Sequence, residues 1–227
     1  TIKYKADGTE LWVKKYNHTT DSYEESSVVV TDASGNILVT GYSRDASTGL
    51  DFATVKYSPE GTELWVKRYN GTGNSQDLAR AIAADMLGNV YVTGSSDRYG
   101  SGQDYVTIKY DPQGELKWLS KYNGSANSLD QATAIAADTT GNVYVTGSSS
   151  DGNGNDYNTI KYNPSGVEQW VRRYNGPGNG FDDAKAIAVD QAGNVYITGM
   201  STGTSLRYDY ATIKYNSDGT ELWVKRY

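Results

Sequence analysis

The chain has 227 residues, with 27 acidic and 21 basic side chains and a formal net charge of −6. No segment gathers a basic cluster, which argues against a nucleic-acid partner, and no apolar run approaches the roughly 20 residues that span a bilayer, which argues against membrane insertion. The chain has no cysteine, so disulfides, thiolate catalysis and cysteine-ligated metals are excluded. Its 20 tyrosines, 5 tryptophans and 25 glycines favour β-structure over helices.

Three sequence anchors return with a period of about 53 residues. The motif Thr-(Ile/Val)-Lys-Tyr begins at residues 1, 54, 107, 159 and 212, so the repeat units begin near these positions. Tryptophan follows the same steps, at Trp12, Trp65, Trp118, Trp170 and Trp223. An Asp-x-x-Gly-Asn turn lies between consecutive tryptophans, in the segments Asp32–Gly41, Asp85–Gly94, Asp138–Gly147 and Asp190–Gly199. A fixed period of this length predicts a repeat architecture in which residues 1–227 form one body.

Each full unit contains four segments with the pattern of β-strands, which we name A, B, C and D in chain order. In the third unit they are Ala132–Ala137, Asn142–Thr146, Asp156–Tyr162 and Val167–Tyr174. The Asp-x-x-Gly-Asn turn joins A to B as a tight hairpin, with the Gly taking a positive φ. Four antiparallel strands per unit are typical of a β-propeller blade. The small residues of strand A fit the innermost position, and Trp on D with Tyr on B and C can fill the space between adjacent blades.

The number of strands leaves the closure of the ring open. The chain begins with strands C and D in residues 1–16 and then runs through four A–B–C–D sets, which predicts four complete blades plus a surplus two-strand unit. Three arrangements are consistent with this count. The chain, which begins with Thr rather than Met, is a trimmed piece of a longer array; two chains form a homodimer with an eight-bladed ring; or residues 1–16 close a four-bladed ring by displacing the last copy. We expect an incomplete ring that missing residues or a second chain complete.

The units AIAADTTGNVYVTGSSS and DYNTIKYNPSGVEQWVRRYNG resemble the SBBP, or seven-bladed beta-propeller, repeat of bacterial and archaeal proteins. The resemblance covers nearly the whole chain. It implies an all-β propeller of four-stranded antiparallel blades in a secreted or cell-surface protein. It carries no catalytic residue over to this chain, because the shared positions are turn and packing positions.

Because strands alternate in direction, the A–B and C–D turns share one face of the propeller, and the B–C and D–A loops share the other. The second face has loops that differ among units, and such loops on a rigid scaffold commonly carry function. A series of acids precedes strand A on this face, and we weigh it as a cation site for calcium: Glu24, Asp77, Asp130 and Asp182. In the opposing interpretation, each acid satisfies backbone donors in its own loop.

Other candidate residues favour structural roles. The Asp of each A–B turn suits a turn acceptor better than a metal ligand. Asp151–Asp156 begins like a calcium loop, but Asp156 and Tyr162 stand where an EF-hand has Gly and Glu. His18 is the only histidine, so a catalytic triad would have to rest on it. The recurring lysines and the basic pairs near the end of strand D are expected to form cross-strand charge pairs.

These observations predict a non-enzymatic scaffold or binding module of a secreted or cell-surface protein, with no cofactor. It would bind a protein or a glycan through the face of B–C and D–A loops. The first alternative is a carbohydrate-active lyase or hydrolase that uses carboxylates at the channel mouth as acid and base. The second is a structural repeat protein without a ligand.

Overall fold

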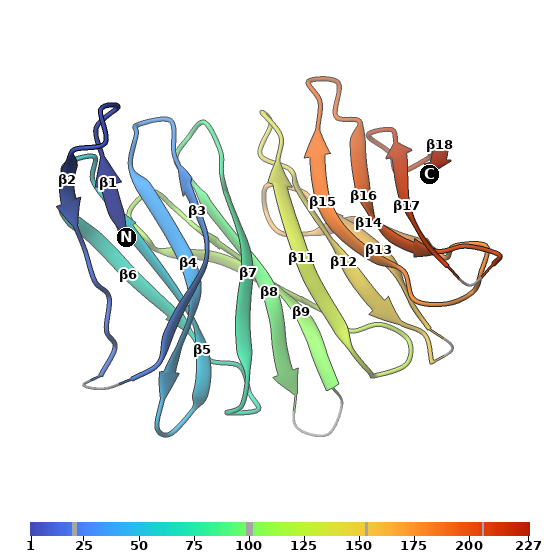
Figure 1. The fold of residues 1–227 in the computed structure, drawn as a ribbon, viewed down its shortest axis with the longest axis horizontal. Helices are drawn as coiled ribbons and strands as arrows, with labels where there is room; N and C mark the ends of the chain where they lie inside the picture. The colour runs from blue at the N-terminus through green and yellow to red at the C-terminus, as the bar shows by residue number, and fades with distance from the viewer. Residues whose placement is uncertain (20–21, 99–101, 153, 206) are drawn as a thin grey trace.

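The computed structural model describes residues 1–19, 22–98, 102–152, 154–205 and 207–227, and its ribbon is shown in Figure 1. The described residues form β-strands and turns, without a helix. A two-stranded N-terminal hairpin is followed by four sheets of four antiparallel strands each, which we call blades 1 to 4. This confirms the predicted all-β class and the repeated four-stranded antiparallel unit.

In every blade the strands pair in chain order, as an antiparallel meander. The N-terminal hairpin is β1 (Ile2–Tyr4) and β2 (Glu10–Val13). Blade 1 is β3 (Glu24–Thr31), β4 (Ile37–Asp45), β5 (Gly49–Tyr57) and β6 (Glu63–Tyr69). Blade 2 is β7 (Asp77–Ala84), β8 (Val90–Arg98), β9 (Gly102–Tyr110) and β10 (Leu116–Tyr122). Blade 3 is β11 (Asp130–Ala137), β12 (Val143–Ser150), β13 (Asn155–Tyr162) and β14 (Glu168–Tyr174), and blade 4 is β15 (Asp183–Val189), β16 (Val195–Thr202), β17 (Tyr208–Tyr215) and β18 (Glu221–Arg226).

Glycine permits two features of the A–B hairpin, as blade 2 shows. Gly88 closes the turn at a φ of 79°, a conformation that costs a residue with a Cβ atom more than it costs glycine. Gly94 lies opposite a bulge between Ala79 and Ala81, and a Cβ at Gly94 would meet the Leu78 carbonyl oxygen at 2.0 Å. The bulge and the close backbone approach therefore require glycine at this position of strand B.

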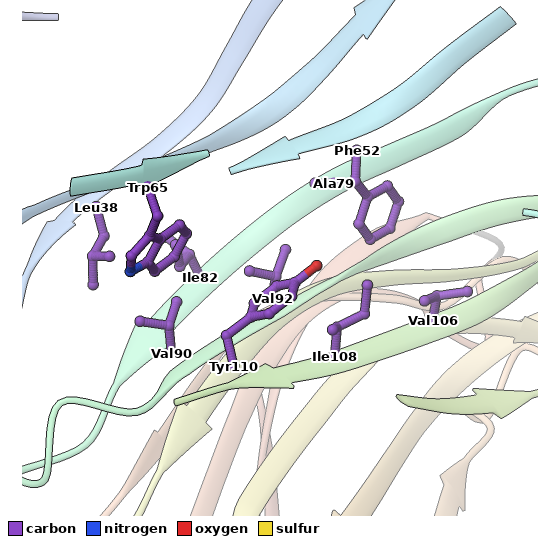
Figure 2. Close-up of a cluster of buried hydrophobic side chains, with 10 residues drawn as sticks. All are labelled: Leu38, Phe52, Trp65, Ala79, Ile82, Val90, Val92, Val106, Ile108 and Tyr110. Carbon is purple, nitrogen blue, oxygen red and sulfur yellow. The ribbon is translucent and has the colours of Figure 1, made fainter. Parts of the chain in front are cut away.

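The blades pack face to face, and strand A is the innermost strand of each. β3 contacts β7, β7 contacts β11, and β11 contacts β15. Figure 2 shows the apolar cluster between blades 1 and 2, in which Trp65 and Phe52 of blade 1 lie against β7, β8 and β9 of blade 2. Equivalent clusters fill the junctions between blades 2 and 3 and between blades 3 and 4. The tryptophans and tyrosines therefore fill the space between blades, as the sequence predicts.

A pair of hydrogen bonds ties each blade to the next one. The Trp65 indole Nε1 donates to the Pro112 carbonyl at 3.1 Å, and Lys56 Nζ donates to the same oxygen at 3.4 Å. The same pair of donors, shifted by one unit, reaches the Pro164 carbonyl from Trp118 and Lys109. The acceptor always belongs to the C–D turn of the following blade, so this contact fixes how successive blades lie against each other.

The sheets do not close into a ring in this structure. The N-terminus and the C-terminus lie at opposite ends of the series of blades (Figure 1). The N-terminal hairpin packs on blade 1, where the Trp12 ring lies 6.1 Å from the Tyr57 ring and its indole donates to the Pro59 carbonyl at 3.2 Å. The idea that residues 1–16 close a four-bladed ring at blade 4 is therefore wrong. The hairpin instead holds the place of strands C and D in a blade that would precede blade 1.

Trp170 and Trp223 occupy the same position in blades 3 and 4, but only Trp170 has a blade in front of it. Trp170 is 8% exposed and lies against Tyr215 of blade 4, whereas Trp223 is 36% exposed. We predict that Trp170→Ala lowers the free energy of unfolding by about 3–5 kcal/mol, because it empties a packed junction. Trp223→Ala is the matched control and is expected to lower it by about 1 kcal/mol or less.

Urea unfolding of dilute protein, followed by circular dichroism, measures both losses. Equal losses for the two variants would contradict the assignment of this tryptophan position to the junction between blades.

Candidate functional site

The two edges of the blades differ in what they offer to a ligand. The β3–β4 and β7–β8 hairpins lie at the upper edge in Figure 1, whereas the β4–β5 loop and the beginning of β7 lie at the lower edge. The upper edge consists of short turns closed by local hydrogen bonds. The lower edge carries the longer B–C and D–A loops, and we call it the loop face.

The aspartates of the A–B turns act as turn acceptors. Asp85 Oδ1 accepts from the backbone nitrogens of Leu87 and Asn89, both at 2.9 Å, and its Oδ2 accepts from the Tyr91 hydroxyl at 2.8 Å. In the last copy, hydrogen bonds from the Asn194 side chain hold the pKa of Asp190 below its usual value. These carboxylates are already used within their own hairpins, as the sequence analysis predicts.

The acids predicted to precede strand A are its first residue in blades 1, 2 and 3 and lie directly before it in blade 4, and each is held by its own D–A loop. Asp77 Oδ2 accepts from the Gly71 backbone nitrogen at 2.5 Å, and Asp130 and Asp182 accept in the same way from Gly124 and Gly176, both at 2.7 Å. In the first copy, Glu24 Oε1 accepts from the backbone nitrogen of His18 at 3.1 Å.

The three aspartates of this series are at most 1% exposed, and burial raises the pKa of Asp77. Within the described part of the chain, no three acidic or histidine side chains gather closely enough to hold a metal ion. The structure thus places the four acids of this series in four separate blades, at the beginning of strand A. Whether this series binds a cation is what the calcium experiment below tests.

A second acidic series lies at the beginning of strand C, where it pairs with arginines of strand D. Arg68 Nη2 lies 2.7 Å from Asp51 Oδ2, and Arg226 Nη2 lies 3.1 Å from Asp209 Oδ2. Arg226 also donates to the Tyr174 hydroxyl of blade 3 at 2.7 Å. The expected charge pairing of the basic residues on strand D is therefore confirmed in these two blades. The signal for its acidic partner is an Asp three residues before each Thr-(Ile/Val)-Lys-Tyr motif after the first, which the sequence analysis missed.

The calcium-like segment and the histidine do not form a catalytic or metal site in the described residues. Arg173 lies 3.5 Å from Asp151 and 2.5 Å from Asp156, so one cation already faces both acids; position 153 of this segment lies outside the described residues. His18 Nε2 lies 3.0 Å from Asp45 Oδ2 on the surface. Ser47 Oγ donates to this Asp45 and not to His18, so a nucleophile activated by the histidine is not formed here.

The loop face carries a hollow of about 550 Å³, which we call the loop groove. Its lining residues are Tyr23, Arg44, Gly49, Leu50, Asn74, Ser75 and Gln76. The groove is built where a B–C loop meets a D–A loop, because the Leu50 backbone nitrogen donates to the Ser75 carbonyl at 2.9 Å. Asn74 adopts a positive φ of 45°, which asparagine tolerates better than most residues, so this D–A loop is a defined turn.

One wall of the loop groove is the Tyr23 ring, which is backed by Tyr42 outside the groove lining. The Tyr23 ring stacks on the Tyr42 ring with a centroid distance of 6.4 Å, and the Tyr23 side chain is 54% exposed. The Tyr23 hydroxyl donates to Glu25 Oε2 at 2.6 Å. Burial, together with the hydrogen bond and charge of Glu25, raises the pKa of Tyr42 to about 12. Both phenols are therefore neutral at physiological pH, and the exposed ring is a fixed apolar surface.

A larger cavity, of about 730 Å³, lies elsewhere in the molecule. It is lined by the N-terminal hairpin and by the strands β3, β4 and β5 of blade 1. Its walls are strand faces that are packed against a neighbouring blade at the other junctions, so this cavity belongs to the blade packing and not to the loop face.

Comparison with known proteins agrees with this architecture. A family model described as a beta-propeller repeat (SBBP) matches residues 64–99, 120–157 and 169–207. An uncharacterized WD repeat-containing protein, L264, of Acanthamoeba polyphaga mimivirus is 26% identical over 242 residues. The match covers 96% of this chain and 15% of that protein, so this chain spans only a small part of its relative. Three segments of the chain therefore match a β-propeller repeat.

Similar solved structures come from proteins of several activities. They include a crystal structure of the eukaryotic initiation factor (TM-score 0.47, 8% identity, 100% of this chain and 65% of that chain). A mutant of Synechocystis apocarotenoid oxygenase matches with a TM-score of 0.48 and 8% identity over 100% of this chain and 55% of that chain. CoXyl43, a β-xylosidase/α-arabinofuranosidase from a compost microbial metagenome, matches with a TM-score of 0.46 and 13% identity over 85% of this chain and 71% of that chain. At TM-scores below 0.5, these likenesses say nothing about the activity of this chain. The described residues include no helix that is long and apolar enough to cross a membrane.

Asp182 provides the sharpest test of the series before strand A, because both of its oxygens accept backbone hydrogen bonds. Oδ1 accepts from Thr202 at 2.9 Å and Oδ2 accepts from Gly176 at 2.7 Å. We predict that Asp182→Ala lowers the free energy of unfolding by about 2–5 kcal/mol, because it leaves two buried N–H groups without an acceptor.

The loss should be the same in millimolar calcium and in a chelator, and the melting temperature of the wild type should not respond to calcium. Asp218→Ala, at an exposed turn position, is the control and should be nearly neutral. A wild-type melting temperature that rises with calcium, and an increase that is lost in Asp182→Ala, would show a cation site instead.

Proposed function

We propose that this chain is a non-enzymatic binding module and that it holds a glycan in the loop groove. The observation that carries the proposal is the exposed Tyr23 ring in a groove that Arg44, Asn74 and Gln76 also line. A volume of about 550 Å³ falls in the usual range for small-ligand sites. An exposed aromatic face offers an apolar surface to the C–H groups of a sugar ring, and amides both donate to and accept from hydroxyl groups.

The charge at the groove narrows the class of glycan. The planar guanidinium of Arg44 matches a carboxylate with two parallel hydrogen bonds, so we propose a glycan that carries an acidic sugar. Arg44 is exposed, and its backbone nitrogen donates to the Tyr23 carbonyl at 2.8 Å, which places its residue beside the aromatic wall. The proposed location is outside the cell or on its surface, as the resemblance to the SBBP repeat implies.

The alternative of a carbohydrate-active enzyme needs an acid and a base that both reach a substrate. The aspartates that precede strand A in blades 2, 3 and 4 are at most 1% exposed, and each accepts a hydrogen bond from its own loop. Side chains used in this way have little access to a substrate, which supports a binding role over hydrolysis or elimination. A protein ligand on the same face remains the outcome that a negative glycan screen would favour.

Tyr23→Ala and Arg44→Ala test the loop groove. Titration calorimetry with acidic and neutral oligosaccharides should show binding of the acidic ones, and we expect either substitution to weaken it by about 10-fold or more, as for central contact residues.

Tyr4→Ala is a matched control, because Tyr4 is also 54% exposed but lies on the N-terminal hairpin, outside the groove lining. Binding that Tyr4→Ala weakens as much as Tyr23→Ala does would place the site elsewhere. Hydrolysis of any oligosaccharide during the titration would favour the enzyme alternative.

A further inference from the structure

The 730 Å³ cavity lies where strands A and B of a preceding blade would pack against blade 1. At the junctions between blades, strands A and B of one blade cover the inner part of the next, but the described residues include no such strands before blade 1. Val29 of β3 shows the consequence, because it is 60% exposed. The residues at the same repeat position in blades 2 and 3, Ile82 and Ile135, are 5% and 9% exposed. The rear face of blade 1 is therefore a junction surface that only β1–β2 covers, and only in its outer part.

The front face of blade 4 is uncovered in the complementary way. Tyr210 of β17 is 57% exposed, although its equivalents Tyr105 and Tyr157 are 1% exposed. Trp223 is 36% exposed, and the described residues hold no further blade to accept hydrogen bonds from Trp223 and Lys214. In the preceding blades, the equivalent tryptophan and lysine donate to a turn carbonyl of the next blade.

These two faces are the two halves of one kind of junction, which the chain forms three times between its own blades. The residues that now cover blade 1 also recur almost unchanged in blade 4. Segments 1–16 and 212–227 differ at three positions and are identical at the other 13 of 16. Ile213, Lys214, Tyr215 and Trp223 thus repeat the residue types that the hairpin presents as Ile2, Lys3, Tyr4 and Trp12.

We propose that a second copy of this chain completes the propeller, with blade 4 of one copy docked on blade 1 of the other in the place that β1–β2 holds in the monomer. In this junction, Trp223 and Lys214 of one copy donate to the Pro59 carbonyl of the other, as Trp12 and Lys3 do within the monomer at 3.2 and 2.7 Å. Two such junctions join four blades of each copy into an eight-bladed ring. The proposal is independent of the glycan site, which lies on the loop face.

Blade 4 of the second copy displaces the hairpin β1–β2, because this hairpin has fewer strand pairings than β17–β18. β1 pairs through three positions with β2 alone and exposes Ile2 and Tyr4, which are 49% and 54% exposed. β17 pairs through eight positions with β16 and also pairs with β18. A complete blade in place of the hairpin buries Val29 and the inner strands in addition, so docking adds apolar contact that the hairpin does not supply. The N-terminal hairpin therefore acts as an internal competitor of the second copy.

Substitution of Trp12 or Trp223, which occupy the same repeat position, tests which of the two elements is displaced when the dimer forms. The mass of the 227-residue chain in solution, measured by sedimentation over a range of concentrations, should rise to twice 24.7 kDa. Trp223→Ala should weaken the dimer about 10-fold or more, because it removes both an aromatic contact and the indole hydrogen bond to the Pro59 carbonyl from the junction. Trp12→Ala should strengthen the dimer, because it weakens only the competing hairpin.

A reversed order of the two tryptophan variants would overturn the proposed geometry and would mean that β1–β2 stays in place while β17–β18 is displaced. Val29→Arg should abolish the dimer, and Leu87→Arg is its control, at an 80% exposed turn position away from the junction. Circular dichroism and the melting temperature of each variant at low concentration show whether the monomer remains folded. A chain that stays monomeric at every concentration overturns the proposal and leaves a preceding repeat unit as the occupant of the cavity; longer head-to-tail assemblies overturn the two-copy ring.

Discussion

A single carbonyl in the C–D turn of a blade determines how the preceding blade lies against it. It accepts from an indole and from an ammonium group, as the Pro112 carbonyl does from Trp65 and Lys56. Lys56 is 2% exposed, and its charge is balanced by Asp32 at 2.9 Å, because an unpaired buried ammonium would be costly. The tryptophan ring packs beside this contact against Tyr110, so apolar burial and hydrogen-bond direction act together. Repetition of this one contact arranges the blades in series.

Much of the fold follows from patterns within one unit. The alternation of residues after each Asp-x-x-Gly-Asn turn predicts the A–B hairpin, and the turn glycines Gly35, Gly88, Gly141 and Gly193 all take a positive φ. The tryptophan period predicts the packing between blades. What the sequence does not reveal is the partner of a side chain in the next unit, because every unit offers nearly the same acceptors. The turn carbonyl that receives Trp65 and Lys56 could therefore be identified only from the structure.

The position of the candidate site on the loop face was predictable, but the contacts of its side chains were not. The loop face follows from the direction of the strands, but Asp77, Asp130 and Asp182 turn towards glycine nitrogens of their own loops. A ring of carboxylates around a channel also requires a particular angle between blades and a closed circle, and neither is encoded in a local pattern. The loop groove depends on Arg44 and Tyr23, which are 21 residues apart in the sequence and meet because the Arg44 nitrogen binds the Tyr23 carbonyl.

Positions at which the repeat units differ are those that the packing of the blades does not constrain, so a ligand can determine them. At the position of Tyr23 the later units have Gln76, Leu129 and Phe181, whereas the tryptophan and the turn glycine of each unit do not change. An unchanging residue here is one that the junction or the turn requires, since each junction presents the same environment. The loop position is free of that requirement, so a ligand can determine the residue type in each unit separately.

The same reasoning applies to the first and last blades. A surface that matches its neighbour at every internal junction can still pair when the neighbour is absent, as in other repeat proteins whose outer units lack a cap. Val29 and Tyr210 are therefore residues of the core type that are exposed because no described blade covers them.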